Sequence, residues 1–173
     1  MEQSQNQADL SSEEISRYAR HISLPEIGIQ GQEKLKNSSI ACIGTGGLGS
    51  PLLIYLAAAG IGRIGIVDFD VVESSNLQRQ IIHTTNSIGL LKTNSAKEQI
   101  LRINPSCQVD LFNKRLTSSN ALEILSPYDL ICDCSDNFPT RYLINDACLL
   151  LKKPNIYGSI ARFEGQASVF NLK

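Results

Sequence analysis

Apolar residues along the chain occur in short runs that are separated by longer segments with helical spacing. The short runs, each the length of a buried strand, lie near Ile40, near Ile66, at residues 108–112 and at residues 129–134. The helical segments lie at residues 51–59, 88–103, 118–126 and 139–151. Regular alternation of strands with helices predicts an α/β fold with a doubly wound, mostly parallel sheet.

Both ends of the chain depart from this alternation. Residues 1–10 are polar, and we expect a disordered tail there. Ser11 and Glu14 have the spacing of a capping box, which predicts a helix through Arg20 or His21, and a second short helix is expected at 28–36. The other end, by contrast, turns to extended segments at 155–159 and 161–170. We expect one domain, residues 11–173, that is incomplete at its C-terminus.

The most informative stretch is a glycine-rich turn between the first strand and the first long helix. It reads Gly44-Thr45-Gly46-Gly47-Leu48-Gly49 and fits the pattern G-x-G-x-x-G. Glycines in this pattern let the backbone turn tightly and approach a phosphate, which is then bound by free amides at the helix start. Asp68 lies 19 positions after Gly49, at the end of the next strand, where an acid can accept hydrogen bonds from a ribose. The stretch predicts a Rossmann-like nucleotide site.

Polar side chains follow two of the predicted strands and point to a triphosphate rather than a dinucleotide. After Asp68 and Asp70 comes the dense polar run Glu73-Ser74-Ser75-Asn76-Leu77-Gln78-Arg79-Gln80. Arg79 carries a guanidinium suited to phosphate oxygens. Asp136 and Asn137 follow the strand at 129–134; either can cap the next helix, and Asp136 can also hold a magnesium ion.

Lys92 presents a choice between two readings. It shares one side of the segment 88–103 with Ala96 and Ile100, the side expected to face the sheet. A lysine there either extends its stem so that the ammonium reaches water or meets an anion. Spacing alone does not decide between them. Together with Arg79 it would supply cations to a leaving pyrophosphate, which suits nucleotidyl transfer.

Composition excludes several other functions. The 173 residues carry a formal net charge of −1 and no Trp, so we expect no nucleic-acid partner. No apolar run is long enough to span a membrane and no secretory signal is visible, so we expect a cytoplasmic protein, with the plastid stroma as the alternative. The five cysteines form no C-x-x-C pair and the two histidines no cluster, which predicts free thiols and no zinc site in this chain.

Taken together, these motifs resemble the ThiF/MoeB/HesA family, the bacterial relatives of ubiquitin-activating enzymes, and in particular its molybdopterin-synthase adenylyltransferases. The resemblance spans roughly residues 11–171. The motifs occur in the expected order: Arg17-Tyr18-Ala19-Arg20, the glycine hexad, Asp68-Phe69-Asp70, Ser75-Asn76-Leu77-Gln78-Arg79-Gln80, Gly89 with Lys92, Arg102-Ile103-Asn104-Pro105 and Asp133-Cys134-Ser135-Asp136-Asn137.

The resemblance implies that ATP and magnesium are used to adenylate the C-terminal glycine of a small ubiquitin-fold sulfur carrier that ends in Gly-Gly. By this analogy Gly47 lies against the phosphates, Asn76, Arg79 and Lys92 contact them, Asp68 takes the ribose and Asp136 serves the metal. Arg20, which spacing alone assigns to a solvated face with Arg17, would reach the nucleotide site of a partner subunit. A homodimer is therefore expected, and a sulfurtransferase is a further candidate partner.

Family members usually carry further parts beyond the point where this chain stops: two C-x-x-C pairs that bind zinc, a crossover loop and sometimes a rhodanese-like domain. We therefore expect zinc only outside this chain. Three other readings stay open. The chain can be a non-catalytic module that binds nucleotide or dimerises, a thiamine-pathway adenylyltransferase, or a nicotinamide-dependent oxidoreductase with the same glycine signature.

Overall fold

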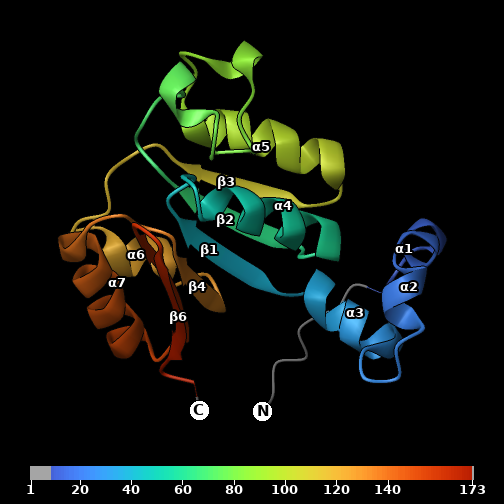
Figure 1. Ribbon diagram of the computed structural model, residues 1–173. Helices are drawn as coiled ribbons and strands as arrows, with labels where there is room; N and C mark the ends of the chain where they lie inside the picture. The colour runs from blue at the N-terminus through green and yellow to red at the C-terminus, as the bar shows by residue number, and fades with distance from the viewer. Residues whose placement is uncertain (1–8, 173) are drawn as a thin grey trace.

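The computed structural model describes residues 9–172 as a sheet with helices on both faces (Figure 1). The expected disordered tail, residues 1–10, lies outside the described part except for Asp9 and Leu10. Six strands form the sheet in the order β3-β2-β1-β4-β5-β6. They are β1 (Ser39–Ile43), β2 (Arg63–Val67), β3 (Gln108–Phe112), β4 (Leu130–Asp133), β5 (Asn155–Ala161) and β6 (Glu164–Phe170). Strands β1 to β5 are parallel and β6 is antiparallel to β5, which confirms the predicted doubly wound, mostly parallel sheet.

Two hydrophobic layers hold the helices to the sheet. Helices α4 (Gly49–Ala59) and α5 (Lys92–Ile103) cover one face, where Leu53 and Ile100 are fully buried. On the other face, α6 (Ala121–Leu125) and α7 (Phe138–Leu151) bury residues such as Leu125 and Ile144. Because both faces are covered, the central strands are continuous apolar runs rather than alternating ones. The sheet reverses its winding between β1 and β4, where ligands of such folds bind beyond the carboxyl ends of the strands.

The N-terminal helices lie near the opposite ends of the strands (Figure 1). The capping box of Ser11 and Glu14 is present, with the Glu14 amide donating to Ser11 Oγ at 3.2 Å. The single helix expected through Arg20 is wrong, however: α1 (Ser12–Arg17) ends at Tyr18 and α2 (Ala19–Ile22) follows before α3 (Gly28–Lys36). Tyr18 is buried, and its hydroxyl accepts a hydrogen bond from Asn104 Nδ2 at 3.2 Å. Packing of this ring against the body of the protein accompanies the break, so Arg17 and Arg20 belong to different helices.

The helix expected at 88–103 is also shorter than predicted. Residues 88–91 are held against the segment after β2, because the amides of Val72 and Gly89 donate to the carbonyls of Leu90 and Val72, each at 2.9 Å. Gly89 has a φ of +86°, outside the helical region. α5 therefore begins at Lys92. Between β2 and α5 the chain forms two short 3-10 turns, η1 (Ser74–Asn76) and η2 (Thr85–Ser87).

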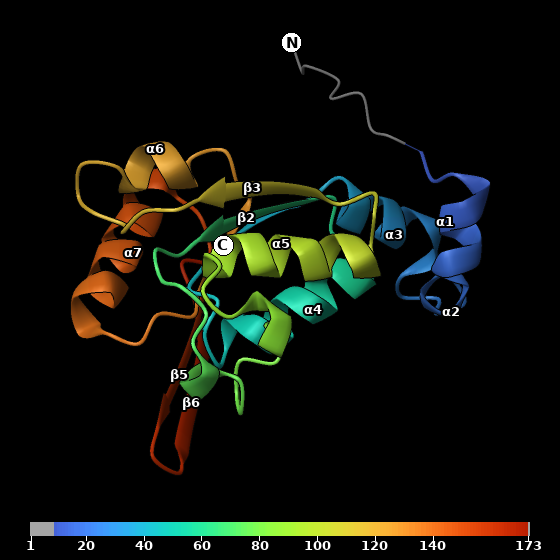
Figure 2. The same cartoon turned by 90° about the horizontal axis from the view of Figure 1, so that it is seen from above.

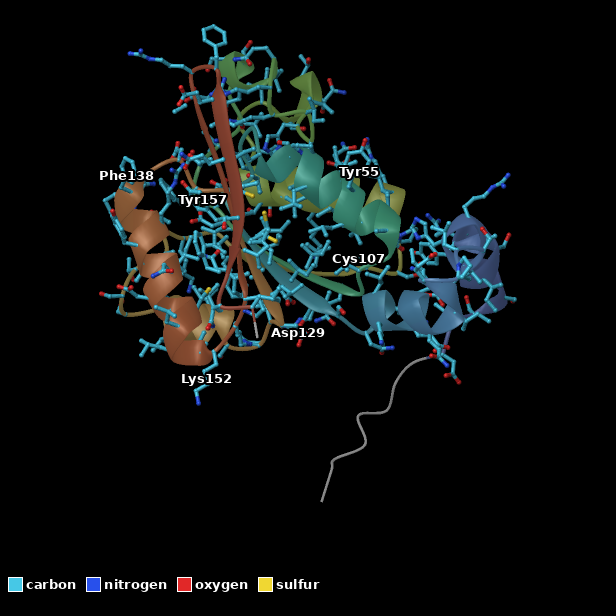
Figure 3. All side chains as sticks on the ribbon, turned by 60° about the horizontal axis from the view of Figure 1, so that its bottom comes forward. Tyr55, Cys107, Asp129, Phe138, Lys152 and Tyr157 are labelled. Carbon is cyan, nitrogen blue, oxygen red and sulfur yellow. The ribbon has the colours of Figure 1, made fainter. Side chains whose placement is uncertain are left out.

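Several large apolar side chains remain exposed, among them residues of α4 and of the β5–β6 hairpin. The apolar sequence of α4 is typical of a helix covered on every side, but Tyr55 on its outer side is 74% exposed (Figure 3). The β5–β6 hairpin projects beyond the rest of the sheet (Figure 2), and all seven residues of β6 are exposed. Among residues 9–172, no helix has the length and hydropathy needed to cross a membrane.

Gly65, in β2, has no room for a side chain because the ring of Tyr128 packs against it. Replacing Gly65 therefore tests this packing. A Cβ on Gly65 would lie 2.3 Å from Cζ of Tyr128, which is fully buried and donates from its hydroxyl to Asp110 Oδ2 at 2.8 Å. The ring cannot retreat without breaking that bond. Gly65→Ala is expected to lower the free energy of unfolding by about 1–3 kcal/mol in denaturant titration.

Gly165→Ala is the matched control for this substitution. Gly165 also lies in a strand, and the nearest atom to its added Cβ would be Ser159 O at 3.9 Å, an ordinary contact. Its effect should stay within about 0.5 kcal/mol. Equal effects of the two substitutions would contradict the packing of Tyr128 against β2.

Candidate nucleotide-binding site

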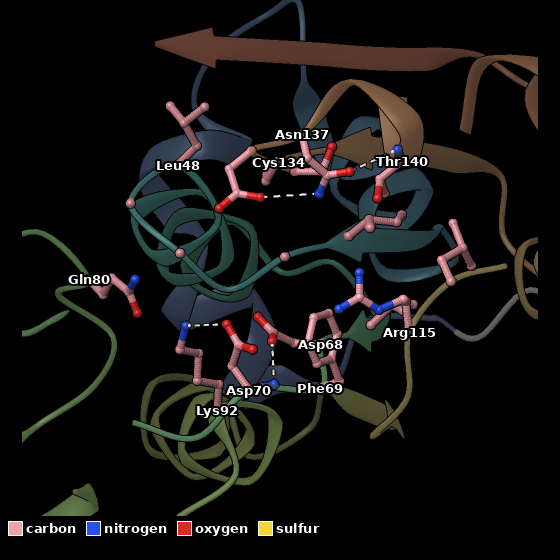
Figure 4. A pocket seen from close by; sticks show the side chains of 18 of the residues that line it. Leu48, Asp68, Phe69, Asp70, Gln80, Lys92, Arg115, Cys134, Asn137 and Thr140 are labelled. Carbon is pink, nitrogen blue, oxygen red and sulfur yellow. Dashed lines mark hydrogen bonds and ion pairs between the residues drawn. The ribbon is translucent and has the colours of Figure 1, made fainter. Parts of the chain in front are cut away.

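A cavity of about 560 Å³ opens at the carboxyl ends of the strands, where the winding of the sheet reverses (Figure 4). Loops after four strands line it: the glycine loop after β1 and the segments after β2, β3 and β4. Nine of the predicted site residues meet there: Gly44, Gly46, Gly47, Asp68, Asp70, Arg79, Lys92, Asp136 and Asn137. The structure thus brings these nine residues together, while their functions stay predictions.

The glycine loop leaves no room for side chains at its two ends. Gly44 has a φ of +94°, and a Cβ there would lie 2.9 Å from Cys134 O. A Cβ on Gly49 would lie 2.0 Å from the carbonyl oxygen of Gly44, so the loop closes on its own backbone. Gly49 thus has a packing function and does not line the cavity. Gly46 and Gly47, between these ends, face the cavity and expose backbone there.

Asp68 organises this loop from the end of β2. Its Oδ2 accepts hydrogen bonds from the amide and the hydroxyl of Thr45, at 2.8 and 2.7 Å, and its Oδ1 accepts from the amide of Asp70 at 3.0 Å. A carboxylate offers about four acceptor positions, so one on Oδ1 remains for a ligand. The predicted contact with a ribose is compatible with this geometry, but only through that oxygen.

Lys92, the first residue of α5, is 6% exposed and pairs with Asp70. Its Nζ lies 3.0 Å from Asp70 Oδ2, and its backbone amide donates to Asp70 O at 2.9 Å (Figure 4). Of the two readings that the sequence left open, the ammonium meets an anion, and in this structure the anion is a protein carboxylate. The side chain of Asp70 is half-exposed, so this ion pair borders the cavity. A bound phosphate can therefore approach the ammonium of Lys92 beside Asp70, and the buried ammonium keeps a counterion when no ligand is bound.

Arg79 extends across the glycine loop. Its Cγ and Cδ would lie 3.8 Å from a Cβ on Gly47, and Nη1 donates to Ser75 O at 3.2 Å. Ser75 O also accepts from Gln78 Nε2 at 3.0 Å. Ser75, Leu77 and Gln78 do not line the cavity. Asn76 lines a smaller neighbouring cavity of about 170 Å³, together with Asp70, Val71, Glu73 and Lys92.

In the loop after β4, Asn137 caps the next helix and Asp136 is left as the candidate magnesium ligand. Asn137 is the N-cap of α7, since its Oδ1 accepts from the Thr140 amide at 3.0 Å. Asp136 is exposed and accepts one hydrogen bond, from Asn137 Nδ2 at 3.2 Å. Among residues 9–172 no three His, Cys, Asp or Glu side chains form a group able to hold a metal ion. Asp136 can thus hold magnesium only together with ligands from a bound phosphate and water.

A buried acid and an arginine support this loop. Asp133 Oδ1 accepts from the amide and hydroxyl of Ser135, at 3.0 and 2.6 Å, and Arg141 donates to Ser135 O at 3.0 Å. Burial raises the pKa of Asp133, although the hydrogen bonds from Ser135 act to lower it. The other carboxylate oxygen, Oδ2, has no partner among the described residues. Arg141 also bonds Tyr157 Oη at 3.1 Å and lines the cavity. Asp133 thereby holds the amide and hydroxyl of Ser135, and Arg141 holds its carbonyl.

Sequence reasoning missed the cations that follow β3. Lys114 and Arg115 line the cavity, and the Arg115 guanidinium lies 4.2 Å from the centre of the Phe69 ring (Figure 4). The rule that ligands bind at carboxyl ends of strands would have found both, had it been applied to the strand at 108–112. Arg141, on α7, gave no such signal. The cavity thus carries five cationic side chains and three carboxylates, a balance that suits a polyanion.

The thiols are free, as predicted, and burial raises the pKa of most of them. Burial raises the pKa of Cys132 to about 12 and that of Cys107 to about 11. A hydrogen bond with Cys134 and burial together raise the pKa of Cys42. Thiolate chemistry at these three positions is suppressed near neutral pH.

Arg20 is the one predicted catalytic residue that the fold keeps far from the cavity. It lies on α2, near the ends of the strands opposite the glycine loop (Figure 1). Within one chain it cannot take part in the site.

Comparison with known proteins gives consistent matches in sequence. The sequence model of the ThiF family matches residues 18–173. The chain is 60% identical over 163 residues to a probable molybdopterin-synthase adenylyltransferase of Porphyra purpurea, covering 94% of this chain and 43% of the relative. It is 52% identical to a sulfur carrier protein adenylyltransferase of Thermus thermophilus, covering 93% of this chain and 59% of the relative.

A solved structure shares the fold. The Escherichia coli tRNA N6-threonylcarbamoyladenosine dehydratase TcdA in complex with ATP superposes with a TM-score of 0.82 at 28% identity, over 88% of this chain and 63% of that one. The present chain thus spans between about two fifths and two thirds of these relatives. The matches in sequence and structure lead to one assignment: the chain belongs to the ThiF family.

Proposed function

We propose that the chain is the nucleotide-binding part of an adenylyltransferase that uses ATP to activate the C-terminal glycine of a small ubiquitin-fold sulfur carrier. The observation that carries the proposal is the single cavity that gathers the glycine loop, Arg79, Lys92 and Asp136. A triphosphate is a polyanion, and a cation-rich cavity beside free loop amides is suited to it. Family membership and the bound ATP of the structural neighbour support the same nucleotide.

The reaction needs little covalent help from the protein. One oxygen of the carrier's terminal carboxylate would attack the α-phosphorus of ATP, and the bond from that phosphorus to the bridging oxygen of the β-phosphate breaks. Pyrophosphate leaves with that oxygen, and an acyl-adenylate remains. Because the carboxylate is already ionised at neutral pH, no general base has to remove a proton. Catalysis then rests on positioning and on stabilising charge.

The cavity residues divide this work among them. We assign the phosphates to the amides of Gly46 and Gly47, with Arg79 and Lys92 stabilising the charge that develops on pyrophosphate. Asp68 would accept from the ribose through its remaining position on Oδ1. Asn76, at the neighbouring cavity, is assigned a phosphate contact as well. Ser75 and Gln78 act indirectly, by holding the segment that carries Arg79.

Magnesium fits the site in company with the nucleotide. Asp136 is an exposed carboxylate at the rim of the cavity, and Mg²⁺ commonly binds one or two carboxylates together with phosphate oxygens and water. When bound, the ion would neutralise part of the phosphate charge.

The partners belong to the whole protein rather than to this part alone, since the chain spans 43% and 59% of the two relatives described above. We propose a carrier ending in Gly-Gly and a cytoplasmic setting, with a sulfurtransferase as a further partner. We also propose a homodimer, because Arg20 lies far from the cavity of its own chain and would have to serve the cavity of a second chain.

Loss of either central cation should abolish ATP–pyrophosphate exchange in the presence of a carrier. Arg79→Ala and Lys92→Met are each expected to lower the exchange rate about 100-fold or more, the usual cost of removing one stabilising group from a transition state. Circular dichroism should show both variants folded, since Lys92→Met keeps the buried stem and Asp70 is half-exposed.

Arg102→Ala is the control. Arg102 lies on the same helix as Lys92 and pairs with Glu98, and neither lines the cavity. Exchange should be unchanged in this variant. Exchange that survives both cavity substitutions would refute the assignment, and ATP binding by the unaltered chain without any exchange would support the non-catalytic module.

Mixed dimers test the contribution of Arg20. Arg20→Ala and Lys92→Met are each expected to be inactive, but a dimer with one copy of each keeps one intact site, made of Lys92 from one chain and Arg20 from the other. Such dimers, purified with two different tags, should recover about half of the wild-type exchange rate. A mixed dimer of Arg79→Ala with Lys92→Met has a defect in each cavity and should stay inactive. Equal rates for the two mixtures would contradict a role across the interface.

A further inference from the structure

Every polar group of Thr45, in the glycine loop, is engaged with the protein. It is fully buried, and Asp68 binds both its amide and its hydroxyl. Its carbonyl oxygen is approached by Ser50 Oγ at 3.1 Å and by His83 Nε2 at 3.2 Å. Asp68 lines the cavity, whereas His83 is buried behind the loop and does not line it.

His83 is held in one orientation. It is 4% exposed, its backbone amide donates to Gln80 O at 3.0 Å, and its Nδ1 lies 2.9 Å from Ser95 Oγ. A carbonyl oxygen can only accept, so Nε2 carries the proton that is donated to Thr45. Burial lowers the pKa of His83, so the ring is neutral near pH 7 and Nδ1 accepts from the Ser95 hydroxyl.

The two hydrogen bonds join α5 to the glycine loop. Ser95 lies on α5 one turn after Lys92, and Lys92 pairs with Asp70 beside the cavity. The path from Ser95 through His83 to Thr45 therefore fixes the loop relative to the helix that carries the cavity lysine. Lys92 and Asp68 are also the charged groups that act on His83, the first opposing its protonation and the second favouring it.

The geometry of the peptide bond between Thr45 and Gly46 links the Thr45 carbonyl, held by His83, to the direction of the Gly46 amide. Residues 9–172 contain no cis peptide bond, so the C=O of Thr45 and the N–H of Gly46 point to opposite sides of one planar unit. With the carbonyl turned inward to His83 and Ser50, the amide of Gly46 is turned toward the cavity that Gly46 lines. A fixed amide needs no reorganisation when an anion binds.

We propose that His83 is a positioning residue, which aims the Gly46 amide at a phosphate of the bound nucleotide by holding the Thr45 carbonyl. The inference rests on the proposed function, since it assumes that a nucleotide occupies the cavity. His83 itself touches no reacting atom. Its effect should appear in the affinity for phosphates and not in the affinity for the nucleoside.

Two amide substitutions separate the hydrogen bond from the volume of the ring. In His83→Gln the amide nitrogen reaches about as far as the imidazole Nε2 and can still donate to Thr45, whereas the shorter Asn in His83→Asn reaches only about as far as Nδ1. Binding of ATP with magnesium and of adenosine is measured by calorimetry on the full chain. We expect His83→Asn to weaken ATP binding about tenfold, the scale of one lost hydrogen bond, and His83→Gln to stay within about threefold of wild type. Adenosine binding should change in neither.

The outcomes are distinguishable. Equal losses for ATP and adenosine, or equal ATP losses in the two variants, would overturn the proposal. If His83→Asn does not fold, Ser95→Ala decides: it frees the ring without removing it and should weaken ATP binding about threefold with adenosine unchanged. An unchanged ATP affinity in Ser95→Ala would then refute the inference. Failure of the unaltered chain to bind ATP would instead refute the proposed function.

Discussion

The site depends on how closely the backbone of the glycine loop approaches its surroundings. A single added carbon at Gly49 would collide with the carbonyl of Gly44, and one at Gly44 would collide with the strand end at Cys134. This contact brings the start of α4 against the ends of β1 and β4. The amides of the loop can face the cavity only because no side chain separates these three elements.

Buried polar groups then fix the loop from behind. Asp68, Ser50 and His83 occupy the hydrogen-bonding groups of Thr45, while Asp133 and Arg141 do the same for Ser135 on the other side of the cavity. Polar groups removed from water are costly unless they are bonded, so each network has few alternative arrangements. The exposed groups at the rim, such as Arg79 and Asp136, each make one such bond, to a residue close by in the sequence.

The sequence predicted what local patterns and strand ends determine. The order of strands and helices followed from the alternation of apolar runs, and the cavity followed from the glycine hexad and the acids at 68 and 136. What the sequence could not give depends on contacts between distant residues. Tyr18 lies where the helix predicted from the local sequence is broken, and its contacts near Gly60 and with Asn104 are not visible in that sequence. The burial of Lys92 is likewise explained only by its ion pair with Asp70. Arg141 lines the cavity only because the fold brings α7 beside it.

The projecting hairpin has a consequence for how the chain behaves in solution. Within residues 9–172 β6 pairs only with β5, so its outer backbone groups have no strand beside them. An exposed edge strand of this kind can pair with an extended segment of another molecule. Proline and lysine, which commonly prevent such pairing, are absent from Glu164–Phe170. At high concentration, isolated copies of this polypeptide are therefore prone to self-association along that edge, unless another part of the protein covers it.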